Sequence, residues 1–299
     1  MDLRDLQYFE VIAQLQHVGK AARVLHRSQP TLTSCLRRLE RHAGCALVER
    51  AGRGIRLTAA GEVLHDFAVK TRLGLRDTEA ALRSAASGLS GEVKLGLVPS
   101  AAQFLLPEIV RGVFEEMPDV LVKTEVATFA VLNPKLHQGE FDFIVVGDSH
   151  RADGVTSIPL SPDDIVPAAA ANHPIFAIPQ PTFADLARYR WILQPRSFPH
   201  RQWIEEAFRQ AGLAPPHVQV ETNMLNLQPQ LVASSGLLTV LPQLQLGAAS
   251  SLRQIEVEGG VFRRRLVIRH REDAHVSPAA KRLMDILART VPCPAGSAR

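Results

Sequence analysis

The segment between Ser28 and Gly44 does most to limit the folds open to this chain. Ser28 is a good N-cap and Pro30 suits a first turn, so we expect a helix that ends at Gly44. Its apolar residues form one stripe with spacings of four, three and four: Leu32, Leu36, Leu39 and Ala43. The opposite face carries short polar side chains followed by arginines. A helix in the major groove of DNA has this layout, and an ordinary amphipathic surface helix is the alternative.

The sequence on either side predicts a winged helix-turn-helix. Apolar residues over 1–15 recur near helical spacing, and 18–25 predicts a short helix with small residues at its centre. The segments 47–50 and 55–57 flank a turn that contains glycine, which is typical of a β-hairpin. Arg53 at the tip of this wing would enter a narrow minor groove, and a solvated turn arginine is the alternative.

The charge of the chain is concentrated in this N-terminal part. The whole chain has a formal net charge of +4, but residues 16–57 hold 9 basic and 2 acidic side chains. Residues 91–299 hold 20 basic and 21 acidic side chains and are nearly neutral. This asymmetry indicates a module that binds a polyanion, joined to a body of another kind. A solvated basic face without a partner is the alternative.

A long helix should follow, from Thr58 as its cap to about Ser87. Residues with alternating spacings of four and three predict a heptad seam that pairs with a second copy of the chain. The seam residues are Leu64, Ala68, Thr71, Leu75, Thr78, Leu82 and Ala85, of which Leu64, Ala68, Leu75 and Leu82 would carry dimerisation. The alternative is that the helix packs against the chain's own body.

Strand and helix patterns alternate from residue 92 onward, which predicts an α/β body with largely parallel sheets. Strands are expected at 93–98, 121–127, 141–147, 165–169, 191–193, 218–221, 237–241 and 266–269, and helices at 103–117, 199–211 and 277–289. The chain would cross between two lobes near 161–164 and return near 263–266. The predicted domains are a DNA-binding domain 1–58, a linker helix 59–90 and an effector domain 91–299. Within the last, lobe I comprises 91–162 and 266–299, and lobe II comprises 163–265.

Composition excludes several other classes of protein. The three cysteines form no C-x-x-C pair, which argues against a disulfide framework and a structural zinc site. No run of about 18 apolar residues is present, so a membrane-spanning helix is not expected. The chain does not start with a basic region before an apolar stretch, so we expect a cytoplasmic protein. No cofactor or metal is expected.

The N-terminal part resembles the LysR-type transcriptional regulators. The resemblance rests on LQYF at 6–9, AARVLH at 21–26, SQPTLT at 28–33, LRRLE at 36–40, LVER at 47–50 and LTAAG at 57–61. Looser matches are FDFIV at 141–145, AFRQAG at 207–212 and SGLLTVLP at 235–242. The family implies a winged helix-turn-helix, a dimerising linker helix and a two-lobed effector domain similar to periplasmic binding proteins. It also implies a homodimer or homotetramer on promoter dyad sites, with contact to RNA polymerase.

The DNA-binding candidates combine this resemblance with the polar face of the predicted third helix. They are Gln29, Pro30, Thr31, Thr33, Ser34, Arg37, Arg38 and Arg41, with Arg53 in the wing. The matching positions place Gln29, Pro30, Thr33 and Ser34 at the bases. Many family members carry Ser-Arg-Gln where this chain has Thr33, Ser34 and Cys35. The recognised DNA sequence should therefore differ from one copied from the family.

The effector site is expected beyond the carboxyl ends of strands, between the lobes. Candidates are Ser100, Ala101, Thr128, Phe129, Gly147 and Asp148 in lobe I, and Arg196, Phe198, Thr222 and Asn223 in lobe II. Backbone N–H groups at a helix start and the Ser100 hydroxyl suit a carboxylate, and Arg196 would pair with an anion. Residues 191–195 resemble the family branch that senses aromatic or sugar acids. A simple N-cap at Ser100 and ordinary surface loops are the alternatives.

Two other functions compete with a regulator. The sequence Gly147-Asp148-Ser149 follows a predicted strand, as in GDSL-type serine hydrolases, where Ser149 would need a base such as His270 or His275. The motif lies mid-chain, the spacing around His275 does not fit, and no G-x-S-x-G is present, so catalysis is disfavoured. A ligand-binding protein without a DNA role is disfavoured by the basic N-terminal part.

Overall fold

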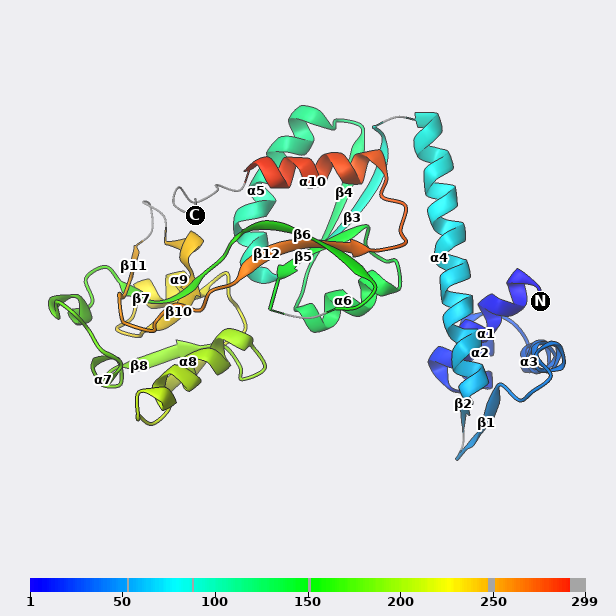
Figure 1. Ribbon diagram of the computed structural model, residues 1–299, viewed down its shortest axis with the longest axis horizontal. Helices are drawn as coiled ribbons and strands as arrows, with labels where there is room; N and C mark the ends of the chain where they lie inside the picture. The colour runs from blue at the N-terminus through cyan, green and yellow to red at the C-terminus, as the bar shows by residue number, and fades with distance from the viewer. Residues whose placement is uncertain (53, 88, 150–151, 247–250, 291–299) are drawn as a thin grey trace. The chain divides into compact units, whose positions relative to one another are not determined.

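The computed structural model describes residues 1–52, 54–87, 89–149, 152–246 and 251–290 (Figure 1). The chain divides into two compact units, Met1–Ala86 and Ser87–Arg299, which are described separately below. The expected linker helix falls within the first unit. Among the described residues, no helix is long and apolar enough to span a membrane.

The N-terminal unit is the predicted winged helix-turn-helix. Its elements are α1 (Leu3–Leu15), α2 (Val18–Val24), α3 (Gln29–Ala43), β1 (Val48–Ala51), β2 (Gly54–Leu57) and α4 (Ala59–Ser87). Helix α3 begins where the Ser28 hydroxyl accepts a hydrogen bond from the Thr31 N–H, and it ends at Gly44 with φ of 70°. Strands β1 and β2 form the antiparallel wing, with Val48 opposite Leu57. Phe9, Leu32 and Leu39 are almost fully buried between the helices.

Helix α4 packs against its own unit over its first turns. Leu64 and Ala68 belong to the core that also contains Leu6, Phe9 and Leu39. The predicted pairing seam requires these two positions to face outward, and they do not. Leu64 and Ala68 instead pack within their own chain, which corrects the expected dimer contact at these positions. Leu75 and Leu82 are 41% and 68% exposed, and they remain available to a partner.

Lobe I of the second unit is a five-stranded sheet covered by helices on both faces (Figure 1). The strand order is β4 (Val120–Val126), β3 (Gly91–Leu97), β5 (Phe143–Gly147), β12 (Arg265–Arg271) and β6 (Val155–Pro162). Alternate residues of β5 point to opposite faces: Phe143 and Val145 pack with α5 (Pro99–Glu116) and α10 (Pro278–Thr290), whereas Ile144 and Val146 pack with α6 (Phe129–His137).

Lobe II contains two smaller groups of strands. Strands β10 (Thr239–Pro242), β7 (Ile165–Ala170) and β11 (Leu252–Gln254) form one sheet, and β8 (Arg190–Leu193) pairs with β9 (His217–Glu221). A bridge between Trp191 and Leu238 joins the two groups. The helical elements are η1 (Pro174–Ala177), α7 (Phe183–Leu186), α8 (Pro199–Gln210), α9 (Gln228–Ala233) and η2 (Gln243–Gln245). Trp191, Ile204 and Phe208 pack together in the core of this lobe.

Two strands connect the lobes, and they make the sheets mixed instead of largely parallel. Strand β6 ends at Pro162 before β7 begins at Ile165, and β12 begins at Arg265 on the return. Because the returning strand runs back beside the outgoing one, β12 is antiparallel to both β5 and β6. In lobe II, β7 is antiparallel to β10 and β11. Strands β6 and β11 were not among the predicted strands.

Candidate functional site

The polar face of α3 is exposed in the N-terminal unit. Seven of the nine DNA-binding candidates are exposed there: Gln29, Pro30, Thr31, Ser34, Arg37, Arg38 and Arg41. Thr33 is half-buried, and its hydroxyl donates to the Gln29 carbonyl oxygen over 3.0 Å. Arg53 lies outside the described residues. The exposed face therefore presents short polar groups near the helix N-terminus and arginines further along.

Arg38 differs from its neighbours because it is held by a buried carboxylate. Its Nε donates to Oδ2 of Asp5 over 3.0 Å, and its Nη2 donates to Oδ1 over 2.5 Å. Asp5 is only 7% exposed, and the hydrogen bond from Arg38 lowers the pKa of its carboxyl group. Nη1 of Arg38 also donates to the Ser34 hydroxyl over 3.3 Å. Arg38 thus joins α3 to α1 and positions Ser34, a role that the sequence did not reveal.

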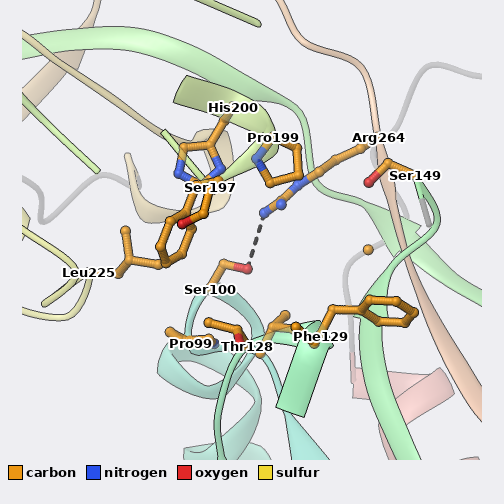
Figure 2. A pocket seen from close by; sticks show the side chains of 14 residues that line it. Pro99, Ser100, Thr128, Phe129, Ser149, Ser197, Pro199, His200, Leu225 and Arg264 are labelled. Atoms are coloured by element: carbon orange, nitrogen blue, oxygen red, sulfur yellow. Dashed lines mark hydrogen bonds between the residues drawn. The ribbon is translucent and has the colours of Figure 1, made fainter. Parts of the chain in front are cut away.

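A cleft of about 460 Å³ lies between the two lobes of the second unit (Figure 2). Its walls come from the starts of α5, α6 and α8 and from the segments after β5 and before β12. The lining residues are Val98, Pro99, Ser100, Thr128, Phe129, Ala130, Gly147, Ser149, Ser197, Phe198, Pro199, His200, Leu225 and Arg264.

The three helices that open on this cleft begin without a side-chain cap. Their N-cap residues are Val98 for α5, Thr128 for α6 and Phe198 for α8, and none makes a side-chain hydrogen bond to the first turn. Helices α1 and α3 are capped by Asp2 and Ser28. A helix N-terminus carries unpaired N–H groups and a partial positive charge. Three uncapped starts around one cleft therefore make an environment that favours an anion.

Arg264 brings a guanidinium group to the cleft, where it is paired with a buried carboxylate. Its Nη2 donates to the Ser100 hydroxyl over 3.1 Å, as the dashed line in Figure 2 shows, and its Nε donates to the Asp163 carbonyl oxygen over 3.1 Å. Nη2 also forms an ion pair with the fully buried Asp163 carboxylate. Burial raises the pKa of Asp163 to about 6, although the nearby guanidinium acts in the opposite direction. The remaining nitrogen, Nη1, has no hydrogen-bond partner among the described residues.

Half of the predicted effector residues line this cleft, namely Ser100, Thr128, Phe129, Gly147 and Phe198. The other five predicted residues are absent from the lining. Ala101 is fully buried in the lobe I core, and Asp148 Oδ1 accepts from the Arg265 N–H over 3.0 Å. Arg196 is exposed and pairs with Glu205. Thr222 and Asn223 do not line the cleft. His200, Leu225 and Arg264 line the cleft but were not predicted, and Arg264 lies in a run of three arginines that gave no sign of a buried partner.

The alternative of a serine hydrolase finds no supporting geometry. Ser149 lines the cleft, but neither His270 nor His275 does. His270 Nδ1 lies 2.9 Å from the Arg271 carbonyl oxygen. The one histidine in the lining, His200, lies on the other side of Arg264 from Ser149 (Figure 2). In the described part of the chain, no group of three or more His, Cys, Asp or Glu residues is placed to hold a metal ion.

Comparison with known proteins identifies the class and then the family. Residues 3–62 match the model of the bacterial regulatory helix-turn-helix protein of the lysR family, and residues 86–292 match the LysR substrate binding domain. The fold and these matches define a DNA-binding transcriptional regulator with an effector-binding domain. The chain belongs to the LysR family, as its N-terminal motifs predicted.

Named relatives and solved structures agree with this assignment. The transcriptional regulator GbpR of Azospirillum brasilense is 29% identical over 80% of this chain and 71% of GbpR. A full-length variant of OxyR from Pseudomonas aeruginosa has a TM-score of 0.63 with 26% identity, covering 97% of this chain and 94% of OxyR. Full-length CbnR in complex with target DNA shares the fold, with a TM-score of 0.60 and 20% identity over 97% of this chain and 100% of CbnR.

Proposed function

We propose that this regulator binds dyad sites near promoters as a homodimer or homotetramer and responds to a small anion in the cleft between its lobes. The proposal extends to a cytoplasmic location and contact with RNA polymerase. The observation that carries the effector assignment is the meeting of Arg264 with three uncapped helix N-termini at one cleft. An anion that binds one arrangement of the lobes better than another shifts the protein toward that arrangement.

DNA recognition is assigned to the exposed face of α3. The Ser34 hydroxyl oxygen accepts from Arg38, which leaves its own proton free to donate to a base or a phosphate. Arg37 and Arg41 are exposed along the same face and supply charge for phosphate contacts. Arg38 is assigned to holding the helix in place, and Arg53 to the wing by resemblance alone.

A selection on genomic DNA tests the proposed function directly. The full-length protein is mixed with sheared DNA from its source at near-physiological salt, and the retained fragments are sequenced with and without added carboxylic acids. Enrichment of a few dyad sites is expected. Retention of all fragments in proportion to their abundance, under every condition, would contradict sequence-specific binding.

We expect Arg41→Gln to weaken binding to all DNA sequences by a similar factor. Loss of one phosphate contact should reduce the slope of log K against log salt concentration by about 0.9. The measurement is a DNA titration at several salt concentrations, with Arg196→Gln as the control because Arg196 is exposed in the other unit and paired with Glu205. An unchanged slope for Arg41→Gln would show that this arginine does not contact DNA.

We expect the double substitution Leu75→Asp and Leu82→Asp to prevent pairing of α4 with a second copy. Both side chains are exposed on the part of the helix beyond Leu64 and Ala68, so two carboxylates there would oppose apolar pairing without disturbing the core. Sedimentation would measure the mass in solution, and Val131→Asp, an exposed apolar position on α6, is the control. A mass equal to that of the unmodified protein would refute the seam.

A further inference from the structure

A small cavity extends the cleft into lobe II. It has a volume of about 10 Å³ and shares Ser100, His200, Leu225 and Arg264 with the cleft. Gln194, Gln245 and apolar residues of the adjoining strands line the rest of it. This volume fits one water molecule or one hydroxyl group. The cavity is therefore a side pocket that adjoins the cleft.

The side chain of Gln194 is turned so that its oxygen remains without a partner. The Thr239 hydroxyl donates to the Ile192 carbonyl oxygen over 2.9 Å, so its oxygen accepts from Nε2 of Gln228. Gln228 therefore presents its amide oxygen to Gln194, whose Nε2 donates to it over 2.6 Å. Gln194 is 1% exposed, and its Oε1 is a buried acceptor with no donor among the described residues. Such an oxygen needs a donor from water or from a ligand.

His200 supplies a second unsatisfied group to the same pocket. The side chain is well buried, since His200 is only 7% exposed, and its Nδ1 has no hydrogen-bond partner among the described residues. Burial, and secondarily the charge of Arg264, lowers the pKa of the imidazole to about 3. The ring is therefore neutral at pH 7, with one nitrogen that donates and one that accepts.

We propose that Gln194 and His200 form a subsite that takes a hydroxyl group, and that the effector is a hydroxycarboxylic acid. This inference rests on the proposed function, because the carboxylate is assigned to Arg264, Ser100 and the helix N-termini. A hydroxyl group donates its one proton to Gln194 Oε1, and its oxygen accepts from the N–H of the neutral imidazole. One ligand would then bind through its carboxylate at Arg264 and Ser100 and through its hydroxyl group at Gln194 and His200.

A hydroxyl group fits this pocket better than an ammonium group. Arg264 lines the side pocket as well as the cleft, and its positive charge contributes to keeping His200 neutral. The same field opposes a second cation at that position, and desolvation adds to the opposition. A water molecule is the remaining occupant, and the experiment separates it from a ligand hydroxyl.

The test compares acids that differ only in the hydroxyl group. Full-length protein is titrated calorimetrically with 3- and 4-hydroxybenzoate against 3- and 4-fluorobenzoate, and with 2-hydroxyhexanoate against hexanoate. We expect at least one hydroxy acid to bind about 10- to 100-fold more tightly than its partner, because an unsatisfied buried acceptor is costly. Gln194→Met and His200→Phe should each remove most of that preference. Gln202→Met, at an exposed glutamine of α8 outside the cleft lining, should keep it.

Each other outcome points to a different failure. Equal binding of hydroxy acids and their partners would overturn the subsite but leave the anion site. A preference that survives both Gln194→Met and His200→Phe would mean that the ligand hydroxyl binds elsewhere, and it would overturn the subsite. If no acid binds while DNA is still bound selectively, both the hydroxycarboxylate and the anionic effector are wrong. If the unmodified protein bound no DNA selectively, that result would instead contradict the proposed function.

Discussion

Replacing Gly61 by alanine should unfold the N-terminal unit and abolish DNA binding. A Cβ atom at Gly61 would overlap the carbonyl oxygen of Leu47 and lie 3.0 Å from its carbonyl carbon. Leu47 cannot move aside easily, because its N–H donates to Glu40 over 3.1 Å and its carbonyl oxygen accepts from the Thr58 N–H over 3.1 Å. Overpacking against fixed backbone should destabilise this small unit by about 3 kcal/mol.

The same helix offers a matched control in Gly74, where an added Cβ would meet nothing within 4 Å. Gly74→Ala should stabilise α4 by up to about 1 kcal/mol through helix propensity. Circular dichroism would follow the helices, and tryptophan fluorescence would follow the second unit alone, since both tryptophans, Trp191 and Trp203, lie there. A Gly61→Ala protein with unchanged melting and DNA affinity would contradict the close packing of α4 on the residue before the wing.

The N-terminal unit was predictable because its signals are local. Ser28, Pro30 and Gly44 mark the ends of α3 within the sequence of the helix itself, and the stripe at Leu32, Leu36 and Leu39 marks its buried face. The strands that join the lobes lack such signals. Strand β6 contains three polar residues and two prolines, and it is defined by pairing with β12, more than a hundred residues later in the chain. The direction of β12 is likewise set by this distant pairing.

The cleft shows the same division between local and distant information. Ser100, Thr128 and Phe198 were found because each follows a predicted strand at the start of a helix. Arg264 was missed because nothing in the run Arg263 to Arg265 tells which arginine meets Asp163. Leu64 was misplaced for a related reason: a heptad pattern shows which residues share a helix face, but it does not show what covers that face.

Two buried groups in the second unit should give opposite contributions to the dependence of stability on pH. The folded-state pKa of His200 is lowered from 6.5 to about 3, so its contribution is present above pH 6.5 and is lost as the pH falls. The folded-state pKa of Asp163 is raised from 3.8 to about 6, so its contribution is fully present below pH 3.8 and is lost as the pH rises through 6. Between pH 7 and pH 5, His200 removes about 2 kcal/mol of stability and Asp163 adds about 1 kcal/mol.

His200→Phe should therefore change the pH dependence of the free energy of unfolding in this range. Removing the His200 contribution should make the change in stability between pH 7 and pH 5 more favourable by about 2 kcal/mol than it is in the unmodified protein. The contributions of Asp163 and of His173, whose pKa is also lowered by burial, are the same in both proteins and cancel in this comparison. Urea unfolding followed by tryptophan fluorescence measures both slopes, and comparing slopes removes any constant effect of the larger ring on packing.

The matching control is His217→Phe, at an exposed histidine that begins β9 in the same lobe. It should leave the pH dependence of the unmodified protein in place, since the substitution keeps both His200 and Asp163. Asp163→Asn should act in the opposite direction, because it removes the Asp163 contribution and makes the change in stability between pH 7 and pH 5 less favourable by about 1 kcal/mol. If the stability of His200→Phe and of the unmodified protein changed with pH in parallel, the imidazole would not be held neutral. The hydroxyl subsite would then lack the neutral imidazole that was assigned to it.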